Sequence, residues 1–383
     1  MQVAGIICEY NPLHLGHKKQ IDFLKAQGYA VVCLMSGNFV QRGHPAIFDK
    51  MCRARAAVEC GADLVLELPV QYALSSAEGF AAGGVEILTK LCHKLCFGAE
   101  NADPNALIEI AQALLSPTFS EKLRPYLDQG LSFPAARSKA LAEMGLQNDL
   151  LETPNNILAV EYCKAILAQN SSMEILPIHR QGSYHAALAD EENPSATALR
   201  NLLENKGNWR DFVPKQGVSC FDNAVLHTIS HGETAMLYRL RTMTEAEFEA
   251  LPYGSEGLWR KLMHASRKYS SLSEIIDSTK SKRYTRTRID RMILCAFLGL
   301  AEKDFNSPVP YCRVLGFNDT GRAILKTVKE SGFFINIGED TRLPYQDMER
   351  RTTALYGLFA EQPEAPIAEK KYRTYYKKIH PQK

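Results

Sequence analysis

The stretch "QVAGIICEYNPLHLGHKKQ" (residues 2–20) decides the fold of this chain. Its apolar start, 2–8, predicts a strand, and its polar turn leads into a helix expected over 17–27. Gly28 follows that helix in a position where glycine commonly ends one. The apolar run 29–35 predicts a second strand, and a strand, a helix and a strand in this order are typical of a βαβ unit with parallel strands.

The same alternation continues to about residue 205. The further strands that we expect are 63–69, 94–98 and 173–180. The further helices are 49–60, 75–91, 154–170 and 195–205, and helical spacing also runs through 106–145. A polar loop containing glycine is expected over 36–45. The pattern predicts an α/β fold with a Rossmann-like parallel sheet.

The rest of the chain has a different pattern. Helical spacing dominates residues 206–305, and a strand, a helix and a strand are expected between 309 and 360. The tail 369–383 is basic and rich in tyrosine. We therefore expect three domains: an α/β domain over 1–205, a mainly helical, basic domain over 206–305, and a small α/β unit with a basic tail over 306–383.

The composition of the 383 residues is that of a globular protein, with 45% hydrophobic side chains. The 45 basic and 43 acidic residues nearly cancel to a net charge of +2, so any basic surface must come from uneven distribution. No apolar run reaches the roughly 18 residues that a membrane helix needs, and the apolar start lacks the charged region of a signal peptide. These features predict a cytoplasmic protein without a membrane segment.

The ten cysteines lie mostly inside apolar segments, which favours buried, reduced thiols. Cys92, His93 and Cys96 raise the alternative of a metal knuckle. No second Cys or His pair follows at zinc-finger spacing, so we expect no metal bound by the protein alone.

The turn after the first strand is the strongest candidate for chemistry, because ligands of open parallel sheets bind beyond the carboxyl ends of the strands. His14, Gly16 and His17 place two imidazoles beside a small residue at a helix start. Glycine lets the backbone approach a phosphate, and free helix N–H groups and imidazoles can stabilise charge that develops during attack at the α-phosphorus of ATP. A metal half-site of two histidines and an ordinary polar helix start stay open as alternatives.

A second phosphate element is "SATALR" (195–200), in which Ser195, Thr197 and Arg200 open a late helix. These side chains are candidates for the β- and γ-phosphates. In the alternative, Ser195 is only a helix cap and Arg200 a solvated side chain. Further phosphate candidates are Lys18, Lys19 and Arg42.

Together these motifs resemble those of the nucleotidylyltransferase superfamily that includes adenylyltransferases and class I aminoacyl-tRNA synthetases, which implies a HIGH-type nucleotidylyltransferase domain. More specific are the segments "GIICEYNPLHLGH", "MSGNFVQRGHPAIFDK", "ADLVLELP", "FGAEN", "PNNILAVEY" and "KSKRYTRTRIDRMIL" in this order. They resemble the bacterial tRNA(Met) cytidine acetate ligase family over most of the chain, closely within 1–205 and more loosely after about 300.

The resemblance implies an ATP-dependent ligase. Such an enzyme joins acetate to ATP as acetyl-adenylate, with release of pyrophosphate. It then transfers the acetyl group to N4 of the wobble cytidine (position 34) of elongator tRNA(Met), giving N4-acetylcytidine and AMP. Mg²⁺ accompanies ATP, and acetate is the co-substrate. An adenylyltransferase of a phosphorylated small molecule and a non-catalytic RNA-binding protein on the same fold stay open as alternatives.

The resemblance also implies site residues, with His14 and His17 as the catalytic pair. The implied ATP-binding residues are Ile7, Cys8, Glu9, Tyr10, Asn11, Pro12, Leu13, His14, Leu15, Gly16, His17, Lys18, Lys19, Gln20, Gly98, Asn155, Arg180 and Gln181. Cys8 departs from the family, which more often has an aliphatic residue there, and Gln181 is expected to act through its backbone.

The implied tRNA needs a basic surface with an aromatic ring for stacking. The basic band of residues 267–291 offers Arg267, Lys268, Lys280, Lys282, Arg283, Tyr284, Arg286, Arg288 and Arg291. The alternative is a solvated helix face. The tail is a weaker second candidate through Tyr372, Tyr375, Tyr376, Lys377 and Lys378. In the loop 36–45 and just after it, Gln41, Arg42 and Asp49 are candidates to line a pocket for the acetyl group and the cytosine.

Overall fold

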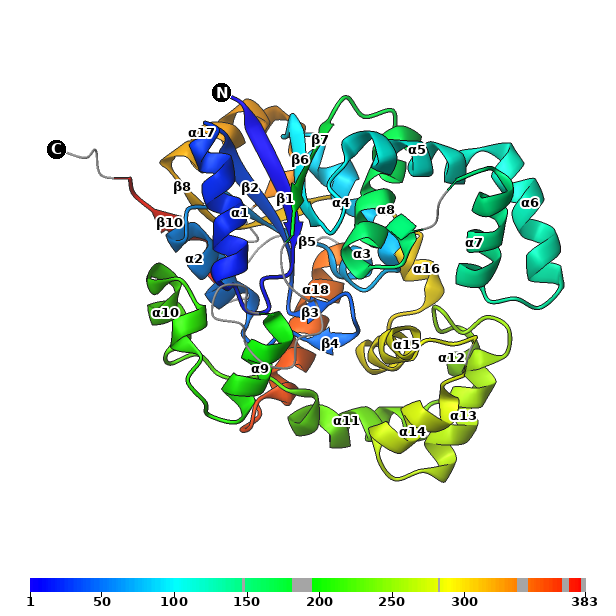
Figure 1. Cartoon of the computed structure of the whole chain (residues 1–383). Helices are drawn as coiled ribbons and strands as arrows, with labels where there is room; N and C mark the ends of the chain where they lie inside the picture. The colour runs from blue at the N-terminus through cyan, green and yellow to red at the C-terminus, as the bar shows by residue number, and fades with distance from the viewer. Residues whose placement is uncertain (147–148, 181–194, 282, 336–343, 367–371, 380–383) are drawn as a thin grey trace.

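A mostly parallel sheet lies at the centre of the computed structural model, which describes residues 1–383 except 147–148, 181–194, 282, 336–343, 367–371 and 380–383 (Figure 1). Five neighbouring strands are parallel, in the order β5 (Leu64–Leu68), β2 (Ala30–Ser36), β1 (Val3–Cys8), β6 (Lys94–Ala99) and β7 (Glu174–His179). These are the five strands expected from the sequence. The predicted α/β fold with a Rossmann-like sheet is confirmed.

Two cores cover the two faces of the sheet, because the central strands are apolar on both sides. Val32 and Leu34 of β2 point into the first core, and Val31, Cys33 and Met35 point into the second. The helices of the first core are α4 (Ala77–Leu88), α5 (Pro104–Leu115), α8 (Pro154–Ala168) and α17 (Asp319–Thr327). Those of the second core are α1 (Leu15–Ala26), α2 (Lys50–Glu59), α9 (Ala196–Glu204) and α10 (Lys215–Phe221).

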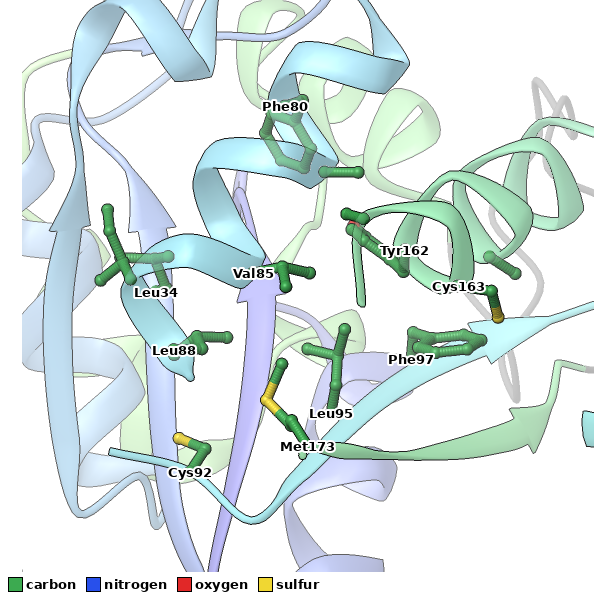
Figure 2. Packing of buried hydrophobic residues seen from close by; sticks show 14 of the residues in the cluster. Leu34, Phe80, Val85, Leu88, Cys92, Leu95, Phe97, Tyr162, Cys163 and Met173 are labelled. Atoms are coloured by element: carbon green, nitrogen blue, oxygen red, sulfur yellow. The ribbon is translucent and has the colours of Figure 1, made fainter. Parts of the chain in front are cut away.

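Figure 2 shows part of the first core, with Leu34 of β2, Leu95 of β6 and Val85 of α4 among its labelled side chains. Beyond α5, the helices α6 (Pro117–Asp128) and α7 (Phe133–Glu143) pack against each other at the edge of the molecule (Figure 1). The helical character expected over 106–145 is therefore confirmed. Short 3₁₀ turns are η1 (Asp149–Leu151), η2 (Arg210–Phe212), η3 (Lys329–Ser331) and η4 (Gly357–Phe359).

A third core belongs to the helical region, which is also confirmed as helical. Its elements are α3 (Val70–Ala73), α11 (Ile229–Thr242), α12 (Glu245–Glu249), α13 (Leu258–Lys268), α14 (Leu272–Thr279), α15 (Arg286–Leu298) and α16 (Glu302–Phe305). Phe39, from the segment after β2, lies in this core, and so do Tyr356 and Phe359 from the C-terminal segment. Residues distant in sequence therefore share one helical core.

The C-terminal segment extends the central sheet. β8 (Cys312–Asn318) pairs antiparallel with β5, β10 (Tyr375–Lys377) pairs parallel with β8, and the short β9 (Phe334–Ile335) also pairs with β8. The expected strand, helix and strand between 309 and 360 are β8, α17 and β9, and they are followed by α18 (Pro344–Tyr356). The domain bounds 1–205, 206–305 and 306–383 stay a prediction, and the structure adds that the last segment shares the sheet of the first.

The basic tail forms strand β10 and is held by acidic side chains of the sheet's helices. Lys377 Nζ lies 2.8 Å from Glu59 Oε2, and the Tyr376 hydroxyl donates to Asp319 Oδ1 over 2.5 Å. The Tyr375 hydroxyl also donates to Glu59 Oε1, so three of the five tail residues proposed to contact tRNA already bind carboxylates of this chain.

The segment 36–45 is more regular than the loop expected from the sequence. It forms an antiparallel hairpin of β3 (Phe39–Val40) and β4 (His44–Pro45). Gly43 turns this hairpin with a φ of +82°, and a Cβ there would lie 2.5 Å from the Arg291 backbone nitrogen of α15. The expectation of a loop is wrong at Phe39–Val40 and His44–Pro45, which form short strands because β3 packs against α3 and β4 against α15 (Figure 1).

One arginine fixes the loops at the carboxyl ends of β1 and β2. The Arg53 guanidinium of α2 is fully buried. It donates to the carbonyl oxygens of Glu9 over 2.6 Å, Ser36 over 3.1 Å and Phe48 over 2.9 Å, and also to that of Gly37. Four carbonyls from three loops thus share one cation, and buried carbonyls need such partners.

We expect Arg53→Met to lower the free energy of unfolding by about 3 kcal/mol, because the buried carbonyls lose a charged donor. Urea denaturation followed by circular dichroism measures this change. The control is Arg55→Met on the same helix, where the arginine is exposed and its loss leaves these carbonyls paired. Equal destabilisation by the two substitutions would contradict this role of Arg53.

Candidate active site

A cavity of about 890 Å³ opens at the carboxyl ends of β1, β6 and β7 and continues to the helical region. We call its two ends the strand-end lobe and the helical lobe. The strand-end lobe contains the turn after β1 and the start of α9. The helical lobe is lined by Ile229, Ser230, Glu233 and Met236 of α11, Leu272, Ser273 and Ile276 of α14, and Arg286, Asp290 and Ile293 of α15. The β3–β4 hairpin borders both lobes.

His14 and His17 line the strand-end lobe with stacked rings, whose centroids are 3.7 Å apart. α1 begins at Leu15, two residues before the expected start, because His14 caps it. The Nδ1 of His14 accepts from the Gly16 amide over 3.1 Å, and the Nδ1 of His17 accepts from the His14 amide over 3.3 Å. The polar helix start is thus real, and it also fixes both rings in the cavity.

The caps determine which nitrogen of each ring can bind a ligand. Since Nδ1 accepts a backbone hydrogen bond in both histidines, a neutral ring carries its proton on Nε2. Nε2 of His14 is buried without a hydrogen-bond partner among the described residues. A buried donor of this kind suits an anionic oxygen of a ligand.

Both imidazoles are electrically neutral in this site. Burial, together with the charges of Arg180 and Arg200, lowers the pKa of His14 to about 3. Burial, His14 and Arg180 also lower the pKa of His17 well below its ordinary value. The two rings therefore act as hydrogen-bond donors at neutral pH, and the positive charge of the lobe comes from arginine.

Two arginines supply that charge. Arg180 follows β7, and its Nη1 donates to Asn155 Oδ1 over 3.3 Å. Asn155 in turn donates to Glu100 Oε1 over 2.6 Å, and Glu100 also accepts from the Thr153 hydroxyl over 2.8 Å. Asn155 thus orients the guanidinium as well as lining the cavity. Glu100 was not selected from the sequence, although it lies inside the quoted "FGAEN".

The second arginine belongs to the SATALR element. Arg200 donates to the Asn11 carbonyl over 2.9 Å and to Thr197 Oγ1 over 3.0 Å, so it is not merely a solvated side chain. Ser195 caps α9, since its Oγ accepts from the Ala198 amide over 3.0 Å. Ser195, Thr197 and Arg200 all line the same lobe as the histidines. The two motifs therefore line one lobe, and their role in phosphate binding stays a prediction.

The glycines leave room for a ligand. A Cβ at Gly16 would lie 3.0 Å from His14 Cε1, so a larger residue would press on the capping ring. A Cβ at Gly98 would meet Arg180 atoms only at 3.8 Å, which is ordinary contact. Gly98 lines the cavity, so its small size keeps space for a ligand and does not relieve a clash within the protein.

Most of the implied ATP-binding residues line the cavity. They are Ile7, Cys8, Glu9, Tyr10, Asn11, His14, Gly16, His17, Lys19, Gln20, Gly98, Asn155 and Arg180. Pro12, Leu13, Leu15 and Lys18 do not; Leu13 is buried in the second core, and Lys18 pairs with Asp22. Gln181 lies outside the described residues. Sequence reasoning missed the aromatic lining of Phe80, Phe97 and Tyr162, although Phe97 directly precedes Gly98.

The hairpin residues divide into two groups. Gln41 and Arg42 line the cavity, as proposed. Asp49 does not, because its Oδ1 caps α2 by accepting from the Met51 amide over 2.7 Å and from the Cys52 amide over 2.9 Å.

The side chains of the basic band are of two kinds: some bind other parts of the chain, and others are exposed cations. Arg288 donates to the Tyr253 carbonyl over 2.9 Å, and the Tyr284 hydroxyl donates to the Glu256 carbonyl over 2.7 Å. Both side chains therefore bind the loop between α12 and α13. Exposed cations of the band are Arg267, Lys268, Lys280, Arg283 and Arg286, whereas Arg291 is buried. Arg283 pairs with Glu256 over 2.8 Å, and Arg286 reaches the helical lobe. Lys282 lies outside the described residues.

The metal knuckle is not formed. Cys92 lies in the first core and Cys96 in the second, on opposite faces of the sheet. His93 Nδ1 accepts from the Val3 amide over 3.2 Å. Within the described ranges, no three His, Cys, Asp or Glu side chains are grouped as metal ligands, and no helix is both long and apolar enough to cross a membrane.

Comparisons with known proteins agree with this geometry. A sequence model of the family described as HIGH Nucleotidyl Transferase matches residues 1–371. A relative from Clostridium novyi named tRNA(Met) cytidine acetate ligase is 40% identical over 354 residues, which cover 86% of this chain and 88% of the relative. A relative of the same name from Clostridium acetobutylicum is 37% identical over 356 residues, with the same coverage.

Solved structures extend the likeness to the whole fold. Apo TmcAL of Thermotoga maritima superposes with a TM-score of 0.91 at 28% identity, covering 99% of this chain and 100% of the other. TmcAL of the same organism bound with alpha-thio ATP gives a TM-score of 0.87 at 29% identity, with the same coverage. The family match and the extent of these identities confirm the resemblance read from the sequence: this chain belongs to the tRNA(Met) cytidine acetate ligase family of HIGH nucleotidyl transferases.

Proposed function

We propose that this chain activates acetate with ATP as acetyl-adenylate and transfers the acetyl group to N4 of the wobble cytidine, position 34, of elongator tRNA(Met). The observation that carries this proposal is the single cavity. It joins a cationic strand-end lobe, suited to a triphosphate, to a helical lobe that the exposed Arg286 lines. An adenylate formed in one lobe needs no release before it meets a base in the other.

In the first half-reaction, an acetate oxygen attacks the α-phosphorus, and the bond to pyrophosphate breaks. The neutral imidazoles of His14 and His17 donate hydrogen bonds from Nε2 to the α-phosphate oxygens, where negative charge grows in the transition state. Arg200 and Thr197 bind the leaving phosphates. Mg²⁺ bound with ATP would supply charge neutralisation to the leaving pyrophosphate.

In the second half-reaction, the cytosine amine attacks the acetyl carbon and AMP leaves. A cytosine amine is a weak nucleophile, so the reaction depends on holding it close to the adenylate. An anticodon loop is single-stranded, and extrusion of its base therefore costs little. Under this proposal the exposed Lys280 and Arg283 contact the phosphates of that loop.

We expect His14→Ala and His17→Ala each to reduce acetate-dependent exchange of labelled pyrophosphate into ATP by about 100-fold or more, the usual loss of one transition-state donor. The affinity for tRNA should stay unchanged. His264→Ala, an exposed histidine of α13, is the control. No exchange in folded wild-type protein would overturn the proposed function, and exchange driven by a phosphorylated small molecule in place of acetate would favour an adenylyltransferase.

The low pKa of His14 also predicts a pH effect on stability. The unfolded chain binds the proton below about pH 6.5 while the folded site rejects it down to about pH 3, so stability is full above pH 6.5 and falls as the pH drops. Between pH 7 and pH 5, the free energy of unfolding should fall by about 2 kcal/mol less in His14→Gln than in wild type. Urea denaturation at both pH values measures the difference, with His264→Gln as the control that keeps the wild-type loss.

Charge reversal in the basic band should separate the two half-reactions. Lys280→Glu combined with Arg283→Glu should weaken tRNA binding by about tenfold or more and reduce its salt dependence, because fewer phosphates are neutralised. Pyrophosphate exchange should be unchanged. The matched control reverses exposed Arg124 and Lys139 on α6 and α7. If both pairs weaken binding equally, the band is not the tRNA surface.

A further inference from the structure

The helical lobe holds a carboxylate that the ATP chemistry does not use. Asp290 lies on the first turns of α15, is only 6% exposed, and lines the cavity. Its neighbours in the described part of the chain include His44 Nε2 and Arg286 Nε, each 3.7 Å from Oδ2, and the Arg291 guanidinium, which interacts with it electrostatically. Both 3.7 Å distances exceed a hydrogen bond, so neither the His44 ring nor Arg286 Nε takes a lone pair of the carboxylate.

The position of Asp290 is strongly fixed. Gly43 of the hairpin packs on the Asp290–Arg291 backbone, where a Cβ would lie 2.6 Å from the Asp290 carbonyl carbon. The amide of Gln41 in the same hairpin donates to Glu9 Oε1 over 2.7 Å. Since Glu9 belongs to the turn that also carries His14, a short chain of contacts connects Asp290 with the strand-end lobe. A hydrogen-bond acceptor whose position is fixed relative to the strand-end lobe is suited to positioning a second substrate.

Charge decides which substrate this lobe takes. Acetate and the triphosphate are anions, and a carboxylate repels both, whereas the strand-end lobe has Arg180 and Arg200. A neutral ring with an amino group fits better, because Asp accepts from the N4 amine of cytosine. The apolar side chains Met236 and Ile276 line the same lobe and suit the faces of a base.

Exposed cations on and before the first turn of α15 indicate RNA as the source of that base. Arg286 lies one helical turn before Asp290, and its side chain is 55% exposed although the residue lines the lobe. Lys280 and Arg283 precede it in the same exposed band. A nucleotide whose base enters the lobe would leave its flanking phosphates beside these cations.

We propose that the helical lobe is the pocket of the target cytosine and that Asp290 is its catalytic base. This inference rests on the proposed function. Asp290 accepts a hydrogen bond from the N4 amine and so selects cytosine over uracil, which presents an oxygen acceptor at that position. As N4 bonds to the acetyl carbon, the bond from that carbon to the AMP oxygen breaks. The N4 proton passes to the Asp290 carboxylate and then to water, and AMP leaves with the electron pair.

The first test measures base selection without catalysis. In the absence of ATP, wild-type protein should bind tRNA(Met) with C34 roughly tenfold more tightly than the same tRNA with U34. In Asp290→Asn the preference for C34 over U34 should fall to a factor of about 1–3. The reason is that an amide can donate to the uracil oxygen as well as accept from the cytosine amine. Asp277→Asn, an exposed carboxylate of α14, is the matched control and should keep the wild-type ratio.

The second test separates the half-reactions. Asp290→Asn should keep acetate-dependent pyrophosphate exchange within about twofold, and lose about 100-fold or more in single-turnover acetyl transfer at saturating tRNA. Retained exchange also shows that the variant is folded. If wild type shows neither exchange nor N4-acetylcytidine by nucleoside mass spectrometry, the proposed function fails.

If wild type is active but binds C34 and U34 tRNA equally, or if Asp290→Asn transfers at the wild-type rate, the assignment of Asp290 is wrong. The wild-type binding comparison needs no variant, so the proposal stays testable even if Asp290→Asn does not fold.

Discussion

The buried Arg53 guanidinium is the interaction on which the site depends. Glycine-containing and polar loops at the carboxyl ends of β1 and β2 leave carbonyls that no strand partner can satisfy, and Arg53 takes four of them. Its charge is fully buried and is distributed over carbonyl dipoles. Because one of these carbonyls belongs to Glu9, the cation that stabilises the fold also sets where the turn toward His14 begins.

The β3–β4 hairpin connects the turn after β1 with helix α15 of the helical region. Gln41 is hydrogen-bonded to Glu9 through its amide, and its carbonyl accepts from Arg291 Nη1 over 3.5 Å. Gly43 packs against the backbone of α15 at a distance that excludes a side chain. The strand-end lobe and the helical lobe are therefore parts of one rigidly connected site, although they come from segments about 250 residues apart in sequence.

The sequence was most informative where structure is local. The five parallel strands, the helices around them and the convergence of His14, Gly16, His17 and Arg200 follow from alternating patterns and from the rule that ligands bind at strand ends. The hairpin could not be recognised, because Phe39 is buried in a helical core that it shares with Val70, Leu74 and residues from 236–300 and 356–359. The same holds for β8 and β10, whose partners β5 and β8 are remote in sequence. Asp290 lacks a local pattern, and only the folded cavity distinguishes it from Asp49, which caps a helix.

The distribution of charge along the cavity gives the two lobes different chemistry within one space. Arg180 and Arg200 favour anions at the strand ends. Burial, with Arg180 as a smaller contribution, lowers the pKa of both imidazoles and keeps them neutral, so His14 and His17 can donate hydrogen bonds without adding charge. A protonated pair would bind the ground-state triphosphate more tightly, and tight binding of the ground state does not accelerate the chemical step. Neutral donors respond mainly to charge that grows during the reaction. At the other end, the Asp290 carboxylate disfavours anions, so under the proposed function electrostatics as well as shape assigns acetate and the triphosphate to the strand-end lobe.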